Sequence, residues 1–126
     1  MSGRWTPRQR LTGWARTAPS VAEVVSTPDP EEIIKAVARV AHEAADGRHR
    51  GIIARGLGRS YGDPAQNAGG HVLRLAPANE QIVVDDQACT VTAGAGVSID
   101  DLLAVIVPRG YFVPVTPGTR YVTVGG

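Results

Sequence analysis

The residues best suited to chemistry in this sequence lie in one loop-like segment, Ala-Arg-Gly-Leu-Gly-Arg-Ser-Tyr-Gly-Asp, at residues 54–63. Its three glycines let the backbone approach a ligand and turn several amides toward one point, which makes a concave anion site. Its two arginines add positive charge, and its serine adds a hydroxyl donor. Together these groups favour a pyrophosphate, and hence a dinucleotide, over a neutral ligand.

Three other interpretations of this segment are a hairpin connection, a P-loop and a Rossmann fingerprint. A glycine-rich hairpin connection with solvated arginines explains the glycines alone about equally well. A P-loop requires Gly-Lys-Ser or Gly-Lys-Thr, which the segment lacks, and a Rossmann fingerprint requires a third glycine where Tyr61 stands. Both of these phosphate motifs are therefore disfavoured.

A second glycine-rich segment, residues 113–126, is able to approach the same ligand from another side. It reads Val-Pro-Val-Thr-Pro-Gly-Thr-Arg-Tyr-Val-Thr-Val-Gly-Gly. The alternative is a Pro-Gly turn before an edge strand. Because a compact domain seldom finishes in a Gly-rich turn after a strand-like run such as 121–124, we expect a truncated gene product.

The remaining candidate ligands and nucleophiles do not form a site in the sequence. His42, His49 and His71 have no metal-binding spacing, and we expect all three on the solvated surface. The lone Cys89 excludes an intrachain disulfide and a cysteine-based metal site. It stands in a strand-like run, which predicts a buried core thiol.

A strand, a helix and a second strand must position the first segment. Residues 21–26 form a short β-branched run, and Asp29-Pro30 is typical of a helix start. Apolar residues then recur at helical spacing until about residues 46–47, and residues 51–55 predict the next strand. The simplest solution is a β-α-β unit with parallel pairing, from which the loop opens at Gly56.

The rest of the chain predicts a small antiparallel or mixed sheet with one more helix. Strand candidates cover residues 72–75, 82–85 and 90–93, and a short helix covers 100–107 before Pro108 and Gly110 end it. Residues 1–20 lack helical or strand periodicity, which predicts an extended leader draped over the domain. The fold class is α+β, with 21–126 as the N-terminal portion of a domain.

Composition limits the function classes. Hydrophobic residues make up 43% of the chain and charged residues 20%, as in ordinary globular proteins. A net charge of +1 argues against nucleic acid as the main partner. The sequence contains no secretory signal pattern and no apolar run long enough to span a membrane.

The two glycine-rich segments and their order resemble the pyrophosphate loops of flavoproteins of the vanillyl-alcohol-oxidase type, which have a PCMH-type FAD-binding domain. The β-α-β start is also similar. Within that superfamily, the chain resembles most closely the decaprenylphosphoryl-β-D-ribose 2′-oxidase family. This likeness runs over residues 11–14, 16–21, 35–41, 55–63 and 117–126.

The resemblance implies FAD as cofactor and assigns two sets of residues to it. The loop set, which would hold the pyrophosphate through its amides, is Ala54, Arg55, Gly56, Leu57, Gly58, Arg59, Ser60, Tyr61, Gly62, Asp63 and Pro64. The second set, which would line the other side, is Gly118, Thr119, Thr123, Val124, Gly125 and Gly126.

Single positions in the loop carry further expectations. Many superfamily members have a flavin-linking histidine where Arg59 stands, so attachment through this loop is excluded. Tyr61 faces the substrate side or packs against the loop. Asp63 is expected to cap the turn, because pyrophosphate repels a carboxylate.

The resemblance also implies an activity. The full enzyme would oxidise the 2′-hydroxyl of a lipid-linked ribose, in synthesis of cell-wall arabinan precursors, and pass a keto product to a separate NAD-dependent reductase. It implies membrane-surface association, with cytoplasmic and periplasmic locations both open. Any catalytic base would follow Gly126, and none can be named here. The alternatives are another FAD-linked sugar, alditol or lactone oxidase, and a nonenzymatic truncated remnant.

Overall fold

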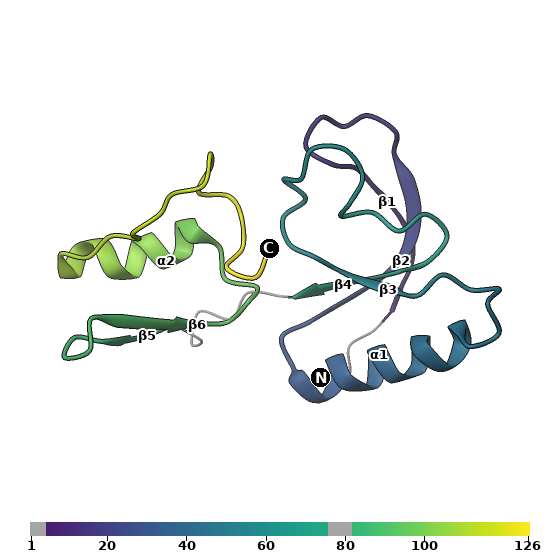
Figure 1. Cartoon of the computed structure of the whole chain (residues 1–126), viewed down its shortest axis with the longest axis horizontal. Coiled ribbons are helices and arrows are strands. Elements are labelled where there is room, and N and C mark those ends of the chain that lie inside the picture. Colours follow the sequence, from purple (N-terminus) through teal and green to yellow (C-terminus); the bar gives the residue numbers. More distant parts are fainter. Residues whose placement is uncertain (1–4, 76–81) are drawn as a thin grey trace. The chain divides into compact units, whose positions relative to one another are not determined.

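Two units, each with its own core, make up the chain in the computed structural model (Figure 1). Unit 1 is Met1–Leu75 and unit 2 is Ala76–Gly126. The structure describes residues 5–75 and 82–126. Because each unit is defined by its internal packing, each is described by itself.

Unit 1 is a four-stranded sheet with one helix. Its strands lie in the order β1-β2-β4-β3. The first pair is antiparallel, whereas β2, β4 and β3 run parallel to one another. The elements are β1 (Thr6–Leu11), β2 (Ser20–Thr27), α1 (Pro30–Ala44), β3 (Ile52–Arg55) and β4 (His71–Leu75).

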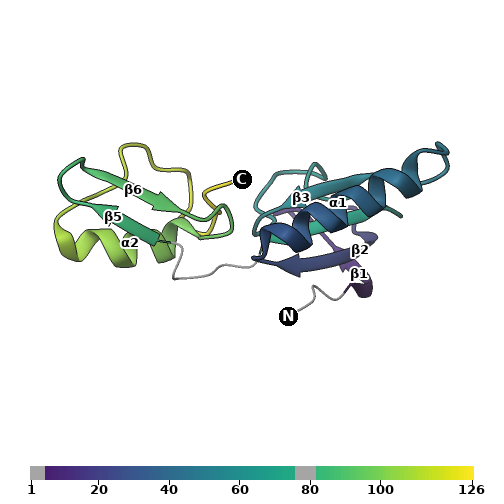
Figure 2. The ribbon, with the colours of Figure 1, turned by 90° about the horizontal axis from the view of Figure 1, so that it is seen from below.

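Helix α1 begins where the sequence predicts it. The Asp29 side chain accepts a hydrogen bond from the Glu31 amide at 2.9 Å, and Pro30 occupies the first turn. Ala36 and Val40 lie on its buried stripe. Figure 2 shows α1 lying against one face of the sheet.

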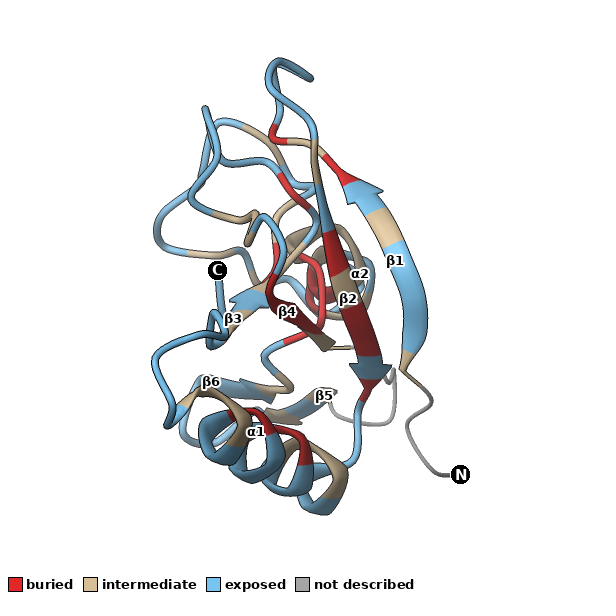
Figure 3. Ribbon diagram, turned by 90° about the vertical axis from the view of Figure 1, so that its right-hand side faces the viewer, coloured by how far each residue is buried: buried red, intermediate tan, exposed pale blue. Residues whose placement is uncertain are grey.

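The two faces of the sheet bury different clusters, because successive strand residues point to opposite sides. On the helix side, Val25 and Leu73 pack with Ala36. On the other side, Val24 and Val72 pack with Leu11 and Ala22. Figure 3 shows that buried residues concentrate on the central strands β2 and β4.

Unit 2 is a hairpin with a helix. Strands β5 (Ile82–Asp85) and β6 (Thr90–Ala93) pair antiparallel, as the sequence predicts. Helix α2 (Ile99–Ile106) begins after Ser98, and the 3-10 turn η2 (Val107–Arg109) ends at Gly110. The core of the unit is Val97, Leu102 and Ile106, against which Ile82 and Val84 of the hairpin pack.

Two expectations about strand pairing are wrong. Strand β4 lies between β2 and β3, so these two do not pair with each other, and β4 does not join the later hairpin. His71, Val72 and Leu73 are buried, which suits the centre of a parallel sheet better than an edge. Residues 6–11 of the expected leader form β1, which pairs with β2 through its backbone although most of its side chains are exposed.

Two single-residue expectations are also wrong. Cys89 is exposed and lies in the turn before β6 with a positive φ of 52°, so it is not a core thiol. His71 is buried, with 8% of its surface exposed, whereas His42 and His49 are exposed as expected. The strand-like run 121–124 contributes one isolated bridge, between Ser98 and Thr123.

The separate cores lead to a stability prediction. Leu73→Ala removes a buried side chain from unit 1, and Leu102→Ala does the same in unit 2. Each is expected to cost its own unit about 2–5 kcal/mol. Native-state hydrogen exchange should then rise mainly in the unit that carries the substitution. Equal acceleration in both units by either variant would show a single cooperative core.

Candidate functional site

The first glycine-rich segment leaves its backbone amides available to a ligand. It begins at the carboxyl end of β3 and returns to the start of β4. Within the described residues, no amide between Leu57 and Ala65 donates a hydrogen bond. Gly58 and Gly62 have φ of +70° and +71°, a region that glycine adopts without steric cost. A run of unpaired amides of this kind is a ready donor set for an anion.

Arg55 fixes the start of this loop. Its guanidinium donates to the carbonyl of Ala65 at 2.7 Å and to the carbonyl of Thr12 at 2.8 Å. Burial lowers the pKa of Arg55, and the charges of Arg74 and Arg59 lower it further. Arg55 remains a cation, because arginine does not lose its proton in proteins. It therefore supplies charge to the site while its N–H groups brace the loop.

Gly58 makes room for this arginine. A Cβ atom on Gly58 would lie against Nη2 of Arg55 and 2.8 Å from its Cζ. Contacts this short force one of the two groups to move. The conformation of the loop and the position of the guanidinium are thus coupled.

The candidate site has two walls. The glycine-rich loop after β3 forms one, and the connection between β1 and β2 forms the other. The Trp14 amide donates to the carbonyl of Ser60 at 2.9 Å, and a Cβ on Gly13 would clash with the carbonyl oxygen of Gly62. The Arg59 guanidinium lies 5.1 Å from the centre of the Trp14 ring and also donates to the carbonyl of Leu57. Figure 1 shows residues 12–19 and 56–70 together on the side of the sheet away from α1.

Between these walls lies an open hollow of about 570 Å³. Its described lining is basic, with three arginines and no carboxylate. The lining residues are Thr12, Gly13, Trp14, Arg16, Arg55, Leu57, Gly58 and Arg59. Three cations without a neighbouring acid favour an anionic ligand, and the unpaired amides of the loop add directed donors.

The second glycine-rich segment lies in unit 2, where it caps α2. The amides of Ile99 and Asp100 donate to the carbonyls of Val122 and Arg120, at 2.9 and 3.0 Å. The Ser98 hydroxyl accepts from the Asp101 amide at 3.0 Å. These bonds satisfy the first amides of the helix, so its N-terminus is not a free anion site.

Within unit 2 the predicted cofactor residues adjoin the same turn. Thr123 is buried, and the Gly125 amide donates to the carbonyl of Ala95 at 2.9 Å. A Cβ on Gly125 would lie 2.8 Å from the Cβ of Ala95. The backbone at Gly125 therefore packs closely on Ala95, in the connection between β6 and α2. Among the described residues, no atom lies within 4 Å of the place where a Cβ on Gly118 would be. The predicted residues at 54–64 belong to unit 1 and those at 118–126 to unit 2, and a shared, two-sided site stays a prediction.

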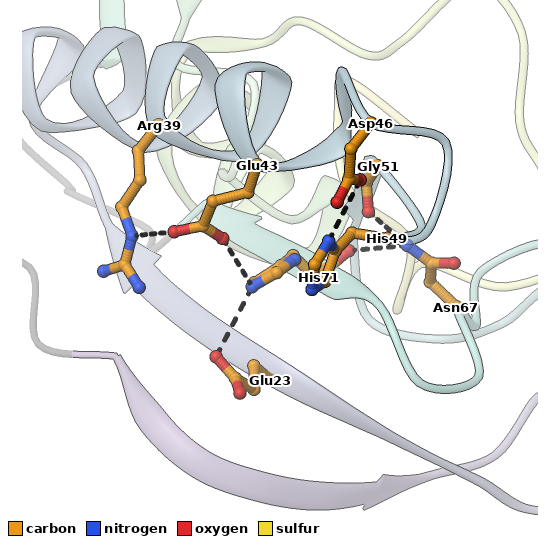
Figure 4. A network of polar contacts seen from close by, with 8 residues as sticks. All are labelled: Glu23, Arg39, Glu43, Asp46, His49, Gly51, Asn67 and His71. Carbon is orange, nitrogen blue, oxygen red and sulfur yellow. Dashed lines mark hydrogen bonds and ion pairs between the residues drawn. The ribbon is translucent and has the colours of Figure 1, made fainter.

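A separate hollow in unit 1 is lined by a charge network (Figure 4). Nε2 of the buried His71 lies 3.4 Å from a Glu23 oxygen and 3.8 Å from a Glu43 oxygen. Glu43 also binds Arg39 at 2.7 Å, and this hydrogen bond lowers the pKa of the carboxyl. The network joins α1 to β2 and β4, which is a structural role.

The positions of Tyr61 and Asp63 bear on their predicted roles. Tyr61 is 82% exposed, so in unit 1 it does not pack against the loop. The carbonyl of Asp63, not its carboxylate, accepts the hydrogen bond of the following turn, from the Gln66 amide at 2.9 Å. Neither side chain lines the basic hollow.

Residues 12–16 are site residues that the sequence analysis left in the leader. The available signal was Gly13 followed by Trp14, since glycine permits close backbone approach and tryptophan presents a flat face to a cation. Gln66 was also missed; its side-chain amide donates to the carbonyl of Leu11 at 2.9 Å.

No helix in the described ranges is both long and apolar enough to cross a membrane. Among those residues, no cluster of His, Cys, Asp or Glu is arranged to hold a metal ion.

Comparison with known proteins agrees with the basic, glycine-lined site. The chain is 54% identical over 121 residues to decaprenylphosphoryl-β-D-ribose oxidase from Mycolicibacterium smegmatis, which covers 96% of this chain and 25% of that protein. The chain thus spans about a quarter of the length of this relative. A mutant of cholesterol oxidase from Brevibacterium sterolicum matches the fold with a TM-score of 0.73 at 20% identity, over 98% of this chain and 24% of the other.

The family model described as "FAD binding domain" matches residues 22–126, which includes both glycine-rich segments. The predicted resemblance to PCMH-type flavoproteins and the predicted cofactor, FAD, are confirmed. The chain belongs to the FAD-binding domain family.

Proposed function

We propose that this chain is the pyrophosphate-binding part of an FAD-dependent oxidoreductase that acts on CH–OH groups. The proposed substrate is decaprenylphosphoryl-β-D-ribose, oxidised at its 2′-hydroxyl. The observation that carries the cofactor role is the run of unpaired amides from Leu57 to Ala65 beside Arg55 and Arg59. The 54% identity to a protein named for this substrate supports the choice of substrate.

The loop residues fit a pyrophosphate by the chemistry of their donors. Backbone amides at Gly58, Arg59 and Ser60 can each donate to a phosphate oxygen, and the missing side chain at Gly58 lets the Arg55 guanidinium lie directly against this turn. The guanidinium of Arg59 uses one N–H for the carbonyl of Leu57, which leaves other donors for an anion. The proposed second side of the cofactor consists of Gly118, Thr119 and residues 123–126.

Bound FAD would supply the acceptor for a hydride from the substrate carbon, and the chain's own residues bind and orient the cofactor. The rigid bracing of Arg55 suits this task, because a preformed donor set needs little reorganisation when the anion binds. Arg59 stands at the place of the flavin-linking histidine in related proteins, and its protonated guanidinium has no nucleophilic nitrogen for such a bond. Retention of the cofactor would then rely here on noncovalent contacts.

The proposed enzyme has a lipid-linked sugar as substrate and works at a membrane surface. Its product would pass to an NAD-dependent reductase partner. The support for these proposals is the name of the 54% identical relative and the resemblance to its family. That resemblance covers residues 11–14, 16–21, 35–41, 55–63 and 117–126.

A matched pair of glycine variants tests the loop. Gly58→Ala adds a methyl group against Arg55, whereas Gly69→Ala adds one in open space at a similar φ of +74°. Both carry the strain of a positive φ, about 1 kcal/mol. Only Gly58→Ala is expected to displace the guanidinium and reduce FAD affinity, by about tenfold or more. Affinity is measured by flavin fluorescence titration of a full-length protein that carries this chain. If both variants lowered FAD affinity equally, the effect of Gly58→Ala would come from backbone strain and not from contact with Arg55.

A chimaera tests the family function. This chain replaces the corresponding quarter of the Mycolicibacterium smegmatis oxidase, to which it is 54% identical. The chimaera is expected to keep flavin absorbance through gel filtration and to turn over decaprenylphosphoryl-β-D-ribose. The isolated chain is expected to bind FAD weakly or not at all and to lack turnover. A folded but colourless chimaera would contradict the cofactor role, and a yellow but inactive one would favour another FAD-linked sugar, alditol or lactone oxidase.

A further inference from the structure

One wall of the basic hollow lies outside the residues that define the FAD-binding family. The family model begins at residue 22, whereas Thr12, Gly13, Trp14 and Arg16 also line the hollow. The relative that is 54% identical matches 96% of this chain. This wall therefore lies on the amino-terminal side of the residues that the FAD-binding family model matches.

Arg16 is the cation of this wall that is free to bind a ligand. Arg55 donates to two carbonyls, and Arg59 donates to one carbonyl and stacks on Trp14. The Arg16 side chain has no hydrogen bond or ion pair within the described residues. Its backbone has a φ of +56°, which non-glycine residues rarely adopt, and its amide donates to the carbonyl of Gly13 at 3.1 Å. This turn holds Arg16 at the hollow.

The rim of the hollow is apolar as well as basic. The Trp14 side chain is 51% exposed and that of Leu57 is 43% exposed, although both are large hydrophobic residues. Apolar surface beside the unpaired cation of Arg16 fits an amphiphilic anion better than a free inorganic one. A phosphate group attached to a hydrocarbon chain combines these two properties.

We propose that Arg16, with Trp14 and the guanidinium of Arg59, forms a subsite for the phosphate group of a lipid-linked substrate. The inference rests on the proposed function and deepens it. The same cations could instead serve the pyrophosphate of FAD. The unpaired amides of the loop already provide donors for that group, and they lie within residues 22–126, which the FAD-binding family model matches.

The experiment uses the 126-residue chain, because every described residue lining the hollow lies in unit 1. Farnesyl phosphate is the lipid-phosphate probe, with farnesol as the uncharged probe and inorganic pyrophosphate as the mimic of the cofactor group. Binding is followed by the NMR shift of the Trp14 indole N–H, which is distinct from that of Trp5. The dispersion of the amide spectrum reports whether each variant is folded.

Arg16→Gln is compared with Arg10→Gln, which removes the same charge from an exposed position on β1 outside the hollow. Arg16→Gln is expected to weaken farnesyl phosphate binding about tenfold, as for the loss of one charged hydrogen bond. It should leave pyrophosphate binding unchanged, and Arg10→Gln should change neither. Arg16→Lys should restore part of the affinity, because it returns the charge without the planar donors.

Three results would overturn the proposal. A wild-type chain that binds farnesyl phosphate no better than farnesol has no phosphate subsite here. Equal weakening by Arg16→Gln and Arg10→Gln would show only a diffuse charge effect. Weakening of pyrophosphate as much as of farnesyl phosphate would assign Arg16 to the cofactor. Failure of the proposed FAD function is detected separately, as a colourless chimaera.

Discussion

The guanidinium of Arg55 holds the two loops of the candidate site together. It binds the carbonyl of Thr12 from one loop and the carbonyl of Ala65 from the other, residues that are far apart in the sequence. Moving this cation from water costs free energy, which is visible in its lowered pKa, and hydrogen bonds from a charged donor offset that cost. Removing the arginine would leave both carbonyls without this donor and would remove one of the links between the two walls of the hollow. The glycine at 58 is required because this side chain occupies the adjacent space.

Sheet topology explains why the loop is long enough to form a site. Since β4 pairs in parallel with β3, the chain must travel from the carboxyl end of β3 back to the amino end of β4. Most such connections are helical, and here residues 56–70 make the crossing without a helix or strand. Side-chain amides replace the missing backbone pairing: Asn67 donates to the carbonyls of Gly51 and His71, and Gln66 to the carbonyl of Leu11. The loop is thereby fixed at residues 66–67, just before β4, while its amides at 57–65 stay unpaired.

The features that could be predicted from the sequence are those with local causes. The Asp29 and Ser98 caps, the hairpin of β5 and β6 and the glycine loop after β3 each depend on a few neighbouring residues. The position of β4 in the sheet depends on which strand has both of its faces buried. Contacts between segments that are far apart in the sequence determine this. Strand β1 could not be found by periodicity, because most of its side chains are exposed and it is held by backbone bonds to β2. The burial of His71 likewise depends on Glu23 and Glu43, which come from two other elements.

The residues predicted to bind the cofactor are divided between the two units, whereas the residues that line the basic hollow all lie in unit 1. The amides and arginines at 55–65 and the wall at 12–16 lie in unit 1, so an anion can meet all of them in one folded body. Several backbone groups of residues 118–126 cap α2, and Gly125 packs closely on Ala95. A ligand contact from this segment stays a prediction, for which Gly118 has open space among the described residues. A dinucleotide long enough to use both sets therefore needs the two units to be held in one arrangement. A single phosphate group needs only the residues of unit 1. Its binding therefore does not depend on how the two units are arranged.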